Sequence, residues 1–64
     1  MQTETAIVGV GPVPGSSRVK ISVEFGDEEM TISVIVPNKG SDEEKKVLAM
    51  SRAKSLARKF GNLP

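Results

Sequence analysis

Hydrophobic and polar residues alternate along two neighbouring stretches in the middle of the chain, residues 18–25 and residues 30–36. A period of two is typical of β-strands that bury one face and expose the other. The polar segment between the two stretches, residues 26–29, has the length of an ordinary hairpin loop. The pattern therefore predicts a β-hairpin with one apolar face.

The length of this loop also suggests a register for the hairpin. With Phe25 opposite Met30 across residues 26–29, the apolar side chains of both strands lie on the same face. The other pairs that this register predicts are Val23 with Ile32, Ile21 with Val34 and Val19 with Val36.

The last third of the chain changes to a helical period. Its apolar residues recur three and four positions apart and fall on one stripe, which we expect to pack on the sheet. The stripe consists of Ala49, Met50, Ala53, Leu56, Ala57 and Phe60. Ser41 and Glu44 have the spacing of a capping box at the start of a helix. We therefore predict one long helix over residues 41–61, with Gly61 as its C′ residue.

The N-terminal part of the chain is less regular. Residues 5–10 are apolar and partly β-branched, which favours a strand, although Gly9 weakens it. Residues 11–17 combine glycine, proline and serine and are predicted to form a loop, and residues 1–4 are expected to be frayed. The N-terminal segment therefore either adds a third strand to the hairpin or stays outside the sheet.

These elements predict one small α+β domain over residues 1–64, an antiparallel β-hairpin or three-stranded meander packed against one long C-terminal α-helix (β-β-α or β-β-β-α). In the meander, residues 30–36 form an outer strand without the proline, glycine or charge that normally protects an edge. Val47 and Leu48 lie off the helical stripe, so they are either singly exposed residues or part of a contact surface. The candidate partner or dimer surface is Met30, Ile32, Val34, Ile35, Val47 and Leu48.

The residue types on which many enzymes depend are absent. The chain has no histidine, cysteine or tyrosine, which excludes a conventional triad, a thiol nucleophile and imidazole or thiolate metal sites. Residues 9–15 are rich in glycine, but Pro12 and Pro14 have no amide hydrogen and no helix follows, so a phosphate-binding loop is not expected. We therefore expect no enzymatic activity, no cofactor and no metal.

The formal net charge of +1 hides an uneven distribution of charged residues. After Glu44 the predicted helix contains six basic residues and no acidic one. Such a face is either an ordinary solvated surface or one that follows nucleic-acid phosphates. Nucleic-acid binding is therefore the alternative function, and its candidate residues are Arg52, Lys54, Arg58 and Lys59.

The strand-to-helix segment resembles the last part of a double-stranded RNA-binding domain. The residues that follow the pattern of that family are Gly40, Ser41, Glu44, Lys46, Ala49 and Ala53. The phosphate-gripping lysines of the family follow its serine, and these positions are Asp42 and Glu43 here. The first helix of the family has no counterpart in this chain. The resemblance therefore implies a shared strand-to-helix arrangement and does not transfer RNA binding.

Size and composition favour an assembly of two copies. A domain of 64 residues buries only about 60% of its unfolded surface, and without cysteine it cannot be stabilised by disulfides. Oligomerisation is the remaining common means of stabilisation. The lack of cysteine, of a signal-peptide pattern and of a long apolar run leads us to expect a cytoplasmic protein without a membrane segment. We expect a small non-enzymatic interaction or regulatory protein that forms a homodimer and contacts an unidentified protein partner.

Overall fold

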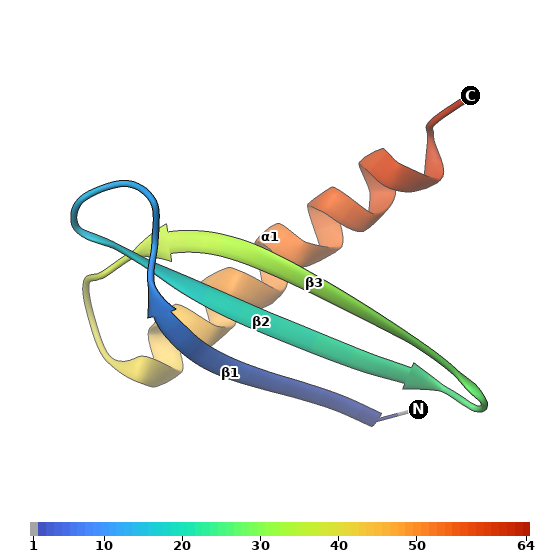
Figure 1. Ribbon diagram of the computed structural model, residues 1–64, viewed down its shortest axis with the longest axis horizontal. Coiled ribbons are helices and arrows are strands. Elements are labelled where there is room, and N and C mark those ends of the chain that lie inside the picture. The colour runs from blue at the N-terminus through green and yellow to red at the C-terminus, as the bar shows by residue number, and fades with distance from the viewer. Residues whose placement is uncertain (1) are drawn as a thin grey trace.

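A computed structural model describes residues 2–64 of the chain. Strands β1 (Gln2–Val10), β2 (Ser16–Phe25) and β3 (Glu28–Pro37) form one antiparallel sheet in the order β1-β2-β3. Helix α1 (Asp42–Gly61) follows and lies across the sheet (Figure 1). The predicted α+β fold is confirmed, in its three-stranded β-β-β-α form.

β1 and β2 both begin earlier than predicted. β1 starts at Gln2, which pairs with Glu24, so residues 2–4 belong to the sheet and the expected fraying is wrong for them. The same expectation for residue 1 lies outside the described residues. β2 starts at Ser16, inside the predicted loop, and Ser16 pairs with Pro37 of β3. Both extensions continue a hydrogen-bonded ladder with a neighbouring strand, and the composition of one segment alone does not reveal such pairing.

The turn between β2 and β3 is tighter than predicted. Phe25 lies opposite Glu28, so only Gly26 and Asp27 connect the strands. Gly26 has a φ of 66°, and Asp27 does not have a positive φ, which is the pattern of a type II′ turn. The predicted register is therefore wrong by two residues. The observed pairs are Val23 with Met30, Ile21 with Ile32 and Val19 with Val34.

The core lies between α1 and one face of the sheet. Its buried residues are Val19, Ile21, Val34, Val36, Ala49 and Ala53. The predicted helical stripe is buried only in part, because Leu56 is 43% exposed and Phe60 is 72% exposed. The physical reason is that α1 runs diagonally to the strands, and its C-terminal half projects away from the sheet on the side of β3 (Figure 1).

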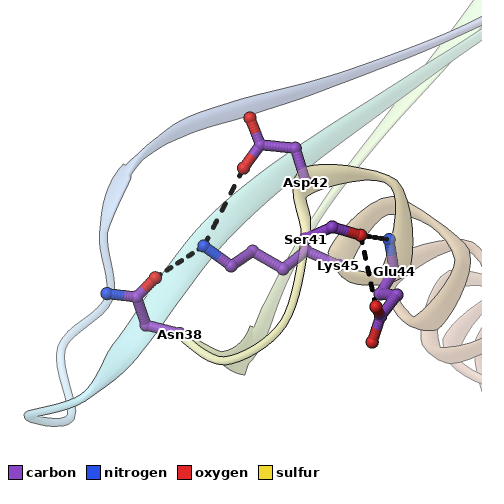
Figure 2. Close-up of polar contacts among 5 residues, drawn as sticks. All are labelled: Asn38, Ser41, Asp42, Glu44 and Lys45. Atoms are coloured by element: carbon purple, nitrogen blue, oxygen red, sulfur yellow. Dashed lines mark hydrogen bonds and ion pairs between the residues drawn. The ribbon is translucent and has the colours of Figure 1, made fainter.

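The start of α1 is fixed by its cap. The hydroxyl oxygen of Ser41 accepts a hydrogen bond from the Glu44 amide at 3.2 Å, and the same hydroxyl donates to Glu44 Oε1 at 3.4 Å (Figure 2). Lys45 Nζ donates to Asn38 Oδ1 at 2.6 Å and lies 4.0 Å from Asp42 Oδ1. These contacts join the β3–α1 loop to the first turn of the helix, so the direction in which α1 leaves the sheet is well defined.

The end of α1 differs from the prediction. Gly61 is still helical, and the amide of Asn62 donates to the carbonyls of Arg58 and Lys59, both at 3.2 Å. Asn62 has a φ of −94°, so the helix ends without the left-handed residue that favours glycine at C′.

Candidate protein-interaction surface

β3 is an outer strand of the sheet, and within residues 2–64 only β2 pairs with it. In an antiparallel sheet the N–H and C=O of a residue point to the same side, and that side alternates along the strand. Phe25 and Glu28 flank a two-residue turn, and the residues in these positions form a backbone hydrogen-bonded pair. The backbone groups of the next residue, Glu29, therefore point away from β2. The residues that point away in this manner, here called the β3 edge, are Glu29, Thr31, Ser33 and Ile35.

One position on the β3 edge is already occupied. The guanidinium group of Arg52 donates a hydrogen bond to the carbonyl oxygen of Ile35. This contact agrees with the direction derived for the odd-numbered residues of β3. Within residues 2–64, no backbone group of another element bonds to the edge-facing groups of Glu29, Thr31 or Ser33. These three residues are the open part of the β3 edge.

A groove runs beside the open edge, between β3 and the projecting half of α1. At one end a hollow of about 520 Å³ is lined by Met30, Thr31, Ile32, Ser33, Leu56, Ala57 and Phe60. The apolar side chains of this hollow are unusually accessible, since Met30 is 39% exposed and Phe60 is 72% exposed. Exposed apolar side chains gathered beside the unpaired edge of a strand are typical of a surface that another chain covers.

The other end of the groove is basic. A second hollow, of about 390 Å³, is lined by Ser33, Val34, Ile35, Arg52, Ser55, Leu56 and Lys59. Leu56 and Ser33 line both hollows, so the two lie side by side and are here called together the β3–α1 groove. The groove therefore changes from apolar beside the start of β3 to cationic beside its end.

The structure distributes the six predicted surface residues over several places. Met30 and Ile32 line the apolar end of the groove, whereas Val34 is 3% exposed and its side chain belongs to the core. Including Val34 as a side-chain contact is therefore wrong, because strand alternation directs it towards α1. Ile35 is half-buried and its side chain lies on the opposite face of the sheet from the helix.

Val47 and Leu48 do not adjoin the apolar end of the groove. Val47 is 71% exposed on α1, which agrees with its predicted position off the apolar stripe. Leu48 is 39% exposed and lines a separate hollow of about 430 Å³ with Pro37 and Lys39, next to the β3–α1 loop. These two residues therefore do not form one continuous patch with Met30 and Ile32.

Leu56 and Phe60 are the surface residues that the sequence pattern missed. They fall on the same helical stripe as the buried Ala49 and Ala53, so their period alone assigns them to the core. The signal that distinguishes them is length. A helix of 20 residues extends about 30 Å, whereas three strands about 4.8 Å apart give a much narrower sheet, so a helix crossing the strands must project beyond it.

The four candidate nucleic-acid residues lie on different sides of α1. Arg52 and Lys59 line the basic end of the groove, and Arg52 is bonded to the Ile35 carbonyl. Lys54 follows Arg52 by two positions and points to a different side of the helix, because residues two apart do not face each other. All four side chains are exposed, and Lys54 and Arg58 are not among the residues that line the groove.

Within residues 2–64, no group of three or more histidine, cysteine, aspartate or glutamate side chains is placed to hold a metal ion. The single helix of this part of the chain is not apolar enough to cross a membrane. Comparisons with protein-family models, with characterised proteins and with solved structures gave no match to this chain.

Proposed function

We propose that this protein is a non-enzymatic interaction or regulatory protein that acts through protein–protein contacts as a homodimer. The observation that supports this function is the open β3 edge with the β3–α1 groove beside it. The edge offers unpaired backbone groups at Glu29, Thr31 and Ser33, and the groove offers exposed apolar side chains next to them. A strand from another chain satisfies the backbone groups and covers the apolar side chains in one step.

The energetics favour covering this surface. Complete burial of a large apolar side chain contributes about 1.5–3 kcal/mol. In the single chain Met30 is still 39%, Leu56 43% and Phe60 72% exposed, so covering them adds the corresponding part of that free energy. Within residues 2–64, the core contains six buried apolar residues, two of which are alanines. Assembly therefore adds a substantial fraction to a small hydrophobic core.

Dilution of the purified protein tests the homodimer. We expect sedimentation equilibrium at micromolar concentrations to give about twice the chain mass of 6.8 kDa, and the thermal unfolding midpoint to fall as the protein is diluted. Both effects follow from mass action, since only the folded dimer is stabilised by association. A folded monomer with the same unfolding midpoint at every concentration contradicts the proposal.

Nucleic-acid binding is a second candidate function, supported by the exposed bases of α1 and by the absence of acidic residues in the helix after Glu44. It predicts a mobility shift with nucleic acid that weakens steeply as salt is added, because phosphate contacts release counterions. The double variant Arg58→Glu/Lys59→Glu is then expected to lose most of the shift. The matched control Arg18→Glu/Lys20→Glu makes the same change of charge on the sheet and is expected to retain it. No shift at low salt rules out this function.

A further inference from the structure

We infer that the occupant of the β3–α1 groove is β3 of a second copy of this chain, paired antiparallel about Thr31. This inference rests on the proposed homodimer and specifies its interface. The two three-stranded sheets then join into one six-stranded antiparallel sheet. Three independent features of the chain, its backbone, its apolar side chains and its charges, lead to this arrangement.

The free backbone groups select the centre of the pairing. Arg52 occupies the carbonyl of Ile35, which leaves Glu29, Thr31 and Ser33 as the open part of the edge. A two-fold axis must superpose these three residues on the same three residues of the second copy. The only antiparallel register that uses all of them places Thr31 opposite Thr31 of the second copy, and Glu29 opposite Ser33 of the second copy.

The same register brings the exposed apolar side chains together. Even-numbered residues of β3 face the helix side of the sheet, and the register places Met30 opposite Ile32 of the second copy. Leu56 and Phe60 project beyond the β3 edge on that side, where they line the groove with Met30 and Ile32. The added strand therefore lies beneath the projecting half of α1 and covers the apolar end of both grooves.

The charges are self-complementary in this register, which favours a second copy over an unrelated strand. Glu28, at the start of β3, lies on the helix side opposite Val34 of the second copy. Val34 lines the basic end of the groove together with Arg52 and Lys59. The carboxylate of each copy therefore approaches the cationic side chains of the other, and the two-fold axis repeats the contact.

Proline substitution on each of the two sheet edges tests the interface. In Thr31→Pro the lost N–H points away from β2, so the monomer fold is retained. The pair of hydrogen bonds at the centre of the dimer is lost, and the proline ring obstructs the second strand. We expect the dimer dissociation constant to rise by at least about 100-fold. The matched control is Thr5→Pro. The ladder between β1 and β2 places the N–H of Thr5 on the open side of β1, so this variant is expected to dimerise as the wild type does.

Sedimentation equilibrium and far-ultraviolet circular dichroism separate the outcomes. A monomeric wild-type protein contradicts both the proposed homodimer and this interface. A wild-type dimer that persists in Thr31→Pro, or that is lost only in Thr5→Pro, leaves the homodimer standing and overturns the pairing through β3. Loss of the dimer in Thr31→Pro, with the circular dichroism of the folded protein retained, supports the inference.

A charge exchange tests the register without any change to the backbone. Glu28→Lys and Lys59→Glu each bring like charges together in the homodimer, so each variant alone is expected to raise the dissociation constant by about tenfold. Mixing the two variants places opposite charges at both contacts of the heterodimer, and we expect its dissociation constant to return to within about threefold of the wild-type value. Equal weakening in the mixture and in the separate variants overturns this register. The charge exchange also tests the pairing through β3 if Thr31→Pro fails to fold.

Discussion

Replacing Ile21 with alanine is expected to lower the free energy of unfolding by about 2–5 kcal/mol, the usual range for removing a large buried aliphatic side chain. Ile21 is 1% exposed on the central strand, where it pairs with Thr5 on one side and Ile32 on the other. The loss combines the transfer free energy of three methylene-sized groups with a cavity that the neighbouring strands cannot close. Domains of this size rarely have more than about 3–5 kcal/mol of stability, so we expect the variant to be largely unfolded.

Urea unfolding followed by circular dichroism, at one fixed protein concentration, measures this effect. The matched control is Ile35→Ala, because Ile35 is half-buried on the face of the sheet that α1 does not cover. We expect its loss to be about 1 kcal/mol or less. Equal losses in the two variants contradict the assignment of the core to the helix-covered face.

The faces of the sheet and the position of the helix follow from the sequence. The alternation in residues 18–25 and 30–36 assigns Val19, Ile21 and Val34 to one face, and these residues are buried against α1. The spacing of Ser41 and Glu44 likewise predicts where the helix begins, since the cap depends on residues four positions apart or closer. Both features are local, and local patterns are sufficient to determine them.

The register of the hairpin did not follow from the sequence. A four-residue loop with Phe25 opposite Met30 and a two-residue turn with Phe25 opposite Glu28 place every side chain on the same face. Hydrophobic alternation is therefore identical for the two registers. The choice depends on Gly26, whose positive φ suits the first position of a type II′ turn.

The candidate surface was only partly predictable for a related reason. A helical period shows which residues share a stripe, but it does not show how far along the helix the sheet extends. Ala53 and Phe60 are equivalent by period, yet the first is 3% exposed and the second is 72% exposed. The diagonal path of α1 produces this difference, and the same path forms the β3–α1 groove.

The divergence of α1 from the sheet leads to the second large effect, which concerns two alanines of the same stripe. Ala49 is fully buried where the helix contacts the sheet, so Ala49→Leu must force the helix away from β2 and β3. We expect the free energy of unfolding to fall by about 1–3 kcal/mol, the usual range for forcing a larger side chain into a well-packed core. Ala57 lines the open groove instead, and Ala57→Leu has space for its side chain.

The comparison of these two variants measures how closely the helix approaches the sheet at each position. Ala57→Leu is expected to change the free energy of unfolding of the monomer by less than about 0.5 kcal/mol, since the added side chain extends into an accessible hollow. Urea unfolding at a protein concentration low enough to keep both variants monomeric provides the measurement. If Ala57→Leu destabilises the protein as much as Ala49→Leu does, then α1 remains against the sheet along its whole length. The β3–α1 groove is in that case closed, and Leu56 and Phe60 return to the core to which their helical period assigns them.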